Sequence, residues 1–165
     1  MDEPRWLARA RRNLGVKETP GRASTPSILK YRVMARVLLE GDDGAVPWCA
    51  IFVNAMLEAV GVRGSRSGMA RSFSRWGKAL PKDRIPAGAV VVLSSDRGPA
   101  SGHVGFACGV SATHVWLLGG NQGDAVSVAP FRRERIVAVV WPGVEPVGPA
   151  MALKVAAAGA EVSDA

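Results

Sequence analysis

Residues 88–93 read GAVVVL, a nearly continuous apolar and β-branched run that is typical of a strand buried on both faces. Further apolar runs follow at 103–110, 113–118, 126–128 and 136–141, separated by segments with Gly, Ser, Asn and Pro. Connections this short favour antiparallel pairing. The second half of the chain therefore predicts an antiparallel sheet or a small barrel.

The first half of the chain has helical patterns instead. Proline or N-cap residues open these segments and glycines close them. The predicted helices run over about 4–14, 25–38, 47–60 and 67–76. In the second helix, Ile28, Leu29 and Val33 are expected on the buried side. Helices that precede strands indicate an α+β fold rather than an α/β fold.

The composition describes one globular domain. The 165 residues are 48% hydrophobic and 21% charged, so the chain is able to bury a single core. Beyond Pro142 the composition shifts to Gly, Pro, Ala and Val. We therefore assign residues 1–142 to the folded domain and residues 143–165 to a flexible tail.

The chain carries no recognisable membrane or export signal. No stretch approaches the roughly 18 consecutive apolar residues that suggest a membrane-spanning helix, so we expect no membrane span. The N-terminal residues MDEPRW lack a basic region followed by an apolar stretch, so no secretory signal peptide is predicted. We expect synthesis in the cytoplasm, and a substrate outside the cell would require separate delivery.

The formal net charge is +7, from 21 basic and 14 acidic residues, and it suits an anionic partner. Nucleic acid and the acidic bacterial envelope both meet that description. Arg and Lys are scattered, however, and no nucleic-acid-binding module is recognisable, so we expect no specific nucleic-acid partner. A basic surface that only keeps the protein soluble is the simpler alternative.

Cysteine and histidine are scarce in the chain. Two residues of each type, without a CxxC or HxxxH spacing, indicate neither a disulfide framework nor a structural zinc site. Glu40, Asp42 and Asp43 form an acidic run that we interpret as a solvated turn rather than a calcium site. We expect neither a metal nor an organic cofactor.

Cys49 follows Trp48 in the first turn of the third predicted helix. Unpaired backbone N–H groups and the positive end of the helix dipole stabilise a thiolate at such a position, which favours a nucleophile. A lone cysteine is otherwise a small buried hydrophobe, and that alternative stays open here. Trp48 fits either the wall of a cleft or the core.

His103 begins the strand pattern at 103–110. Because side chains alternate along a strand, His103 shares a face with the small residues Gly105 and Ala107, which leaves room for a helix end and a substrate. Cys108 points to the opposite face, and we expect it in the core. The other histidine, His114, is expected in a turn or at the surface.

Residues 119–122 read GGNQ and end the next predicted strand. A Cys–His pair needs a third group that holds the imidazole in one tautomer. The two glycines let the backbone approach closely, so Asn121 is the first choice for that group, and Gln122 is a candidate oxyanion donor or substrate contact. An ordinary Gly-Gly-Asn-Gln turn is the alternative.

Taken in order, these motifs resemble a known superfamily. PWCA at 47–50, GHVGF at 102–106, GGNQ at 119–122 and WP at 141–142 are similar to the CHAP and NlpC/P60 cell-wall hydrolases. The closest likeness is to a phage-associated branch that carries the PWCA–GHVGF–GGNQ signature. The resemblance covers about residues 4–142.

The resemblance implies a papain-like α+β fold, with the N-terminal helices packed on the sheet. It also implies a peptidoglycan hydrolase that uses no metal or organic cofactor. Such an enzyme cuts an amide bond of the murein stem peptide or its link to muramic acid. Cys49 is the expected nucleophile, His103 the base and Asn121 the group that orients the imidazole.

Trp48, Gly102 and Gln122 are the expected contacts to the substrate, bacterial peptidoglycan, and we expect the enzyme to be a monomer. One position departs from the family pattern. Many CHAP members carry Glu two residues before the Asn, where this chain has Gly119. Only an amide then remains to orient the imidazole.

The mode of delivery separates the remaining alternatives. The missing signal peptide fits an endolysin that a holin releases, and a virion- or tail-associated lysin of the same chemistry is the nearest alternative. A non-catalytic module that binds peptidoglycan or nucleic acid is the alternative from a different class.

Overall fold

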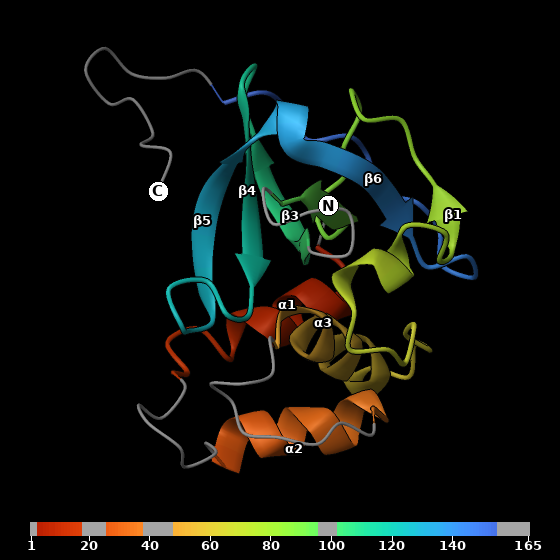
Figure 1. Ribbon diagram of the computed structural model, residues 1–165. Coiled ribbons are helices and arrows are strands. Elements are labelled where there is room, and N and C mark those ends of the chain that lie inside the picture. Colours follow the sequence, from red (N-terminus) through yellow and green to blue (C-terminus); the bar gives the residue numbers. More distant parts are fainter. Residues whose placement is uncertain (1–2, 18–25, 38–47, 96–101, 155–165) are drawn as a thin grey trace.

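A computed structural model of the chain describes residues 3–17, 26–37, 48–95 and 102–154. These ranges hold three α-helices and one antiparallel sheet of six strands in the order β1-β6-β2-β3-β4-β5 (Figure 1). The helices are α1 (Arg5–Arg11), α2 (Pro26–Ala35) and α3 (Cys49–Ala59). The strands are β1 (Lys78–Ala79), β2 (Val90–Ser94), β3 (Gly102–Val110), β4 (His114–Gly119), β5 (Ser127–Arg132) and β6 (Ile136–Trp141). The predicted α+β class is confirmed.

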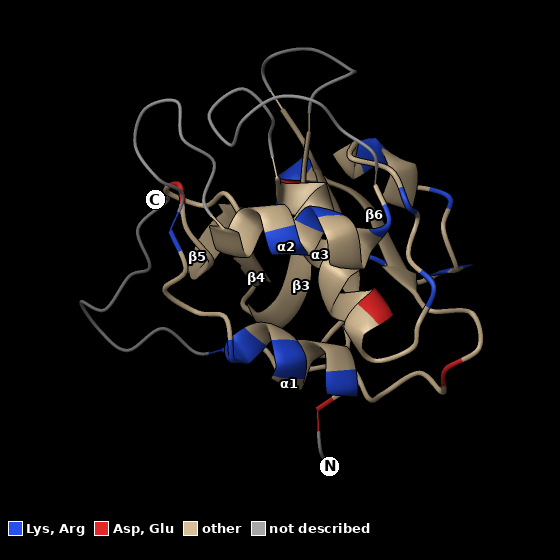
Figure 2. Ribbon diagram, turned by 90° about the horizontal axis from the view of Figure 1, so that it is seen from below, with Lys and Arg blue, Asp and Glu red and all other residues tan. Residues whose placement is uncertain are grey.

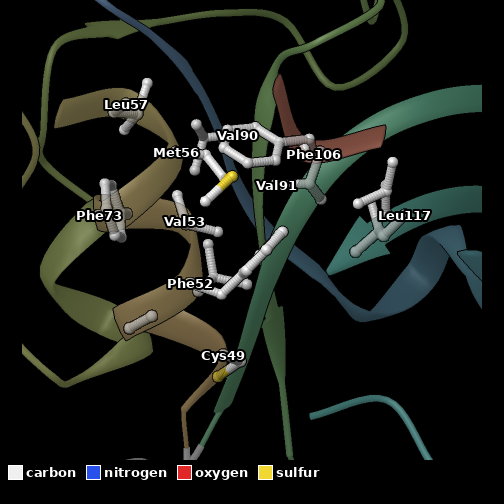
Figure 3. Packing of buried hydrophobic residues seen from close by; sticks show 14 of the residues in the cluster. Cys49, Phe52, Val53, Met56, Leu57, Phe73, Val90, Val91, Phe106 and Leu117 are labelled. Carbon is white, nitrogen blue, oxygen red and sulfur yellow. The ribbon is translucent and has the colours of Figure 1, made fainter. Parts of the chain in front are cut away.

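Helix α3 lies between the sheet and α2, and α1 packs against both α3 and β4 (Figure 1). This central position explains the composition of α3, because every residue from Cys49 to Leu57 is buried. Figure 3 shows Phe52 and Met56 extending from α3 toward Phe106 on β3. A helix covered on several sides has no polar face to offer solvent, so its apolar side chains hold the two layers together.

The five strands expected from the apolar runs are confirmed as β2 to β6, with ends shifted by a few residues. Strand β1 was not predicted. It has only two residues, which pair with β6 at Lys78–Trp141 and Ala79–Val140. Two residues carry no measurable periodicity, so a strand this short leaves no signal in the sequence.

The described part of α2 differs from the prediction in the side that it buries. Leu29 and Val33, expected on the buried side, are 41% and 79% exposed. Ile28 is buried as expected, and Tyr31 and Ala35 are buried in place of the other two residues. The buried residues follow a three- and four-residue spacing through Tyr31, whose partly polar side chain disguises the stripe.

The helix predicted over 67–76 is reduced to a single 3-10 turn, Ala70–Phe73. The Ser72 hydroxyl donates to the carbonyl of Met69 at 2.6 Å. Serine side chains that bond the nearby backbone in this way compete with regular helix formation.

The environments of Cys108 and His114 also differ from expectation. The β3–β4 register shifts between Ala107 and Gly109, so the alternation of faces breaks at Cys108. Cys108 is half-buried rather than in the core, and its thiol donates to the carbonyl of Trp116 at 3.5 Å. His114 is buried rather than exposed, since only 9% of it is accessible.

The chain continues to pack against the domain after Pro142. The N–H of Met151 donates to Ile85 O at 2.9 Å, and that of Lys154 donates to Val110 O at 2.6 Å. Part of the segment that we assigned to the tail therefore contacts the domain, and the predicted flexibility of residues 155–165 lies outside the described residues. None of the helices in the described ranges is long and apolar enough to cross a membrane.

Candidate active site

Cys49 is the first residue of α3, and its thiol lies where this helix meets the start of β3. The backbone N–H of Val104, the residue after His103, is close enough to the sulfur to lower its pKa. The backbone N–H groups of Ala50 and of Cys49 itself form hydrogen bonds to the sulfur from the helix side, and these also lower its pKa. The two motifs that contain Cys49 and His103 are therefore brought together.

Burial is the dominant influence on the Cys49 thiol. It raises the pKa above the ordinary value, and the hydrogen bonds from the three backbone N–H groups oppose this effect only in part. The residue is 5% exposed. The position at the helix start predicts a stabilised thiolate, but the loss of solvation on burial raises the pKa by more than the helix start lowers it. The resting protein therefore holds a neutral thiol at neutral pH.

The orientation of the His103 imidazole is set by Gln122. The Gln122 Nε2 atom donates to Leu117 O at 3.1 Å and to Ser127 O at 2.8 Å, which uses both amide hydrogens. Gln122 Oε1 must then accept from His103 Nε2, 2.8 Å away. The Nε2 atom carries the proton in this arrangement, and Nδ1 keeps the lone pair that a base needs.

Gln122 thus takes the place that we predicted for Asn121. Asn121 has a φ of 60°, in the left-handed region that Asn tolerates better than most residues. The residue therefore serves the conformation of the turn, and the imidazole binds its neighbour. The expectation that Gln122 supplies an oxyanion donor is also wrong, because both hydrogens of its amide are already donated to backbone carbonyls.

Gly119 and Gly120 permit this arrangement because neither has a side chain. A Cβ on Gly119 would lie 2.5 Å from Gln122 Oε1. A Cβ on Gly120 would lie 2.7 Å from the ring of Trp48 and 2.8 Å from the Cβ of Phe52. The close approach predicted for the two glycines is confirmed. It lets the turn pack directly against the start of α3.

The other two expected substrate contacts have different surroundings. Trp48 is fully buried, and its ring stacks on that of Tyr31 with 6.3 Å between centroids. Trp48 is therefore part of the core and not a substrate contact. Gly102 is half-buried at the start of β3, where a Cβ would lie 2.8 Å from Leu93 O. Its lack of a side chain keeps β3 close to β2.

Two further side chains lie beside His103, and no motif in the sequence pointed to either. The ring of Phe131 on β5 has its centroid 5.3 Å from that of His103. The guanidinium carbon of Arg135 lies 5.6 Å from the Phe131 centroid. Burial lowers the pKa of His103, the hydrogen bond to Gln122 opposes this, and the positive charge of Arg135 lowers the pKa further. The neutral imidazole is favoured.

A pocket of about 530 Å³ lies elsewhere, between the N-terminal segment and residues 145–151. Trp6 and Trp141 contribute to its lining, whereas Cys49 and His103 do not. The candidate active site is therefore defined by its reactive side chains and not by the size of a cavity.

Within the described ranges, no group of three or more His, Cys, Asp or Glu side chains gathers in a way that could hold a metal ion. The acidic run at Glu40, Asp42 and Asp43 lies outside the described residues. No protein-family model matches the chain, and no curated protein matches it either.

Proposed function

We propose that the chain is a cysteine hydrolase that cuts an amide bond of bacterial peptidoglycan. One observation carries the proposal. The half-buried His103, held in one tautomer by Gln122, directly precedes Val104, whose backbone N–H forms a hydrogen bond to the thiol of Cys49. A nucleophile, a base and a group that orients the base are the three parts that thiol-dependent acyl transfer requires. A helix that presents the cysteine to an antiparallel sheet is consistent with a papain-like arrangement.

The proposed mechanism starts from a neutral pair. As the Cys49 sulfur attacks the scissile carbonyl, His103 Nδ1 takes the thiol proton, and Gln122 Oε1 stabilises the resulting imidazolium through Nε2–H. Backbone N–H groups at the start of α3, which bond to the sulfur in the resting state, stabilise the oxyanion in this mechanism. His103 then donates the proton to the leaving amine, and water hydrolyses the thioester.

The assignment of peptidoglycan as substrate depends on the motif resemblance and on the net charge of +7. The muramoyl–L-alanine amide and a bond between amino acids of the stem peptide both fit this chemistry. Release through a holin and delivery by a virion are both compatible with it. A monomer without cofactors remains the expected form.

The test is zymography on purified murein with the wild type, Cys49→Ala and Cys108→Ala. Cys108 is the matched control, because it is the second cysteine and lies on β3 away from the His103 end. The wild type and Cys108→Ala should clear the murein, and Cys49→Ala should lose several orders of magnitude in rate. Clearing by Cys49→Ala at the wild-type rate contradicts the proposal. Mass spectrometry of the released fragments identifies the bond.

The deep burial of Cys49 favours one second candidate, a module that binds peptidoglycan without cutting it. A buried cysteine with a raised pKa is often unreactive. In that case the wild type and Cys49→Ala should sediment equally with insoluble murein, and neither should release fragments.

A further inference from the structure

Arg135 is held rigidly at the edge of the candidate active site. It lies on the short 3-10 helix between β5 and β6, and its Nε and Nη2 atoms both donate to the carbonyl of Ser94, at 3.3 and 2.7 Å. Its guanidinium lies over the ring of Phe131, and that ring lies against His103. The three side chains thus form a continuous series that ends at the proposed base.

Among the described residues, no carboxylate forms an ion pair with Arg135. Arg5, Arg11 and Arg66 each form an ion pair with a glutamate in the described part of the chain, whereas Arg135 forms none. Its Nε and Nη2 atoms donate to Ser94 O, and Nη1 has no hydrogen-bond partner among the described residues. A guanidinium has five N–H donors in a planar fork, so at least the Nη1 edge is available to a ligand.

An unbalanced cation at this place is unfavourable for the proposed chemistry. Its positive charge opposes the formation of the imidazolium that the proposed mechanism requires at His103. If Arg135 served only to connect the 3-10 helix to β2, its charge would not need to lie so close to the base. An anion bound at Nη1 would cancel the penalty and strengthen the base when substrate is present.

We propose that Arg135 and Phe131 form a subsite for a free carboxylate on the substrate, close to the scissile amide. The planar guanidinium binds the carboxylate, and the Phe131 ring supplies an apolar wall between it and His103. This inference rests on the proposed function, and it narrows the substrate class to peptides with a carboxylate, rather than a carboxamide, beside the bond that is cut.

The first test needs no peptidoglycan. Iodoacetate and iodoacetamide alkylate Cys49 by the same displacement of iodide, with loss of the thiol proton, and they differ in that one carries a carboxylate. In a Cys108→Ala background, the rate ratio of iodoacetate to iodoacetamide should exceed that of free cysteine by about tenfold. Arg135→Gln should reduce the ratio to the value for free cysteine, and Arg135→Lys should keep part of it.

Arg133→Gln is the matched control for this experiment. Arg133 lies on the same 3-10 helix and also donates to backbone carbonyls, those of Ser111 and Lys82. This variant should leave the ratio unchanged. Because iodoacetamide reports the general accessibility of Cys49, a ratio cancels any loosening of the fold. An unchanged ratio in Arg135→Gln, or an equal fall in Arg133→Gln, overturns the subsite.

The second test uses two stem peptides that are identical except for a carboxylate or a carboxamide beside the scissile bond. The wild type should prefer the carboxylate by about tenfold in kcat/KM, and Arg135→Gln should lose this preference through KM. If the wild type cuts no murein but keeps the alkylation ratio, the proposed function fails and the anion subsite stands. If murein is cut and neither preference depends on Arg135, only the subsite fails.

Discussion

Cys49 and His103 share a single physical cause for their resting state, which is burial. Burial raises the pKa of the thiol and lowers that of the imidazole, so both groups are neutral near pH 7. The pattern around Pro47 could place the cysteine at a helix start, but no local pattern reveals how deeply a neighbouring strand covers it. General-base catalysis from a neutral pair is therefore expected, rather than attack by a preformed thiolate.

The pH dependence of activity tests this state. Only neutral His103 can accept the thiol proton, and its pKa lies below the ordinary value of 6.5. The acid limb of activity should therefore have its midpoint below pH 6.5, with activity falling as the pH drops through the lowered pKa. Arg135→Gln removes one cause of the lowering and should move this acid limb upward. Profiles of kcat/KM against pH provide the measurement, and a wild-type limb at or above 6.5 contradicts the assignment.

Gln122 and Asn121 offer a direct comparison of adjacent amides. Gln122→Ala removes the acceptor at His103 Nε2 and should lower kcat by about 10²-fold, since the base loses its fixed tautomer. Asn121→Gly keeps the left-handed backbone at φ 60° and should cost far less activity. Steady-state kinetics on both variants decides the matter. A larger loss in Asn121→Gly would restore Asn121 as the orienting residue.

The motif alone could not distinguish these two amides. Its Gly-Gly pair correctly predicted a close approach of the backbone, and the structure shows that this approach is to the start of α3. The choice between Asn121 and Gln122 depends on which backbone torsion each adopts, and on two carbonyl acceptors, Leu117 and Ser127, that flank the turn in space. Those acceptors are set by the β4–β5 pairing, which a short sequence motif does not contain.

At the level of elements, long apolar runs predicted their strands well, because a strand that is buried on both faces must be apolar at nearly every position. The failures lie where tertiary contacts override a local pattern. The register shift beside Cys108 breaks the alternation that assigned it to the core. The side that α2 buries runs through Tyr31, which bonds the Asn13 side chain at 2.7 Å, and a binary pattern of apolar residues misses it.

The packing of the 119–122 turn on α3 gives a prediction at this scale. Gly120→Ala would place a Cβ 2.7 Å from the Trp48 ring, and such overpacking should lower the free energy of unfolding by about 1–3 kcal/mol. Activity should fall further than stability explains, because the turn carries Gln122. Gly143→Ala is the control, since its Cβ meets nothing within 4 Å. Urea denaturation and murein hydrolysis on both variants provide the comparison.

For the whole molecule, the charge is widespread rather than gathered on one element. Figure 2 shows Lys and Arg on α1, on α2 and in the loops near β6, with few acidic segments between them. A spread of this kind attracts an extended anionic surface more than it recognises a particular sequence of groups. The proposed recognition of a single carboxylate by Arg135 therefore adds a specific contact to a general attraction.

The segment after Pro142 gives the last prediction, because it contacts two parts of the domain that are distant in sequence, the segment between β1 and β2 and the end of β3. Met151 and Lys154 donate to the carbonyls of Ile85 and Val110, and Lys154 Nζ lies 4.6 Å from the Trp116 centroid.

A chain that ends at Pro142 should unfold with a free energy about 2–3 kcal/mol lower than one that ends at Lys154. The longer chain keeps every one of these contacts and is the matched reference. Urea denaturation of the two chains is the measurement. If the two urea denaturation curves have equal midpoints and equal slopes, the segment contributes nothing to the stability of the domain. The boundary at residue 142 would then describe the folding unit correctly.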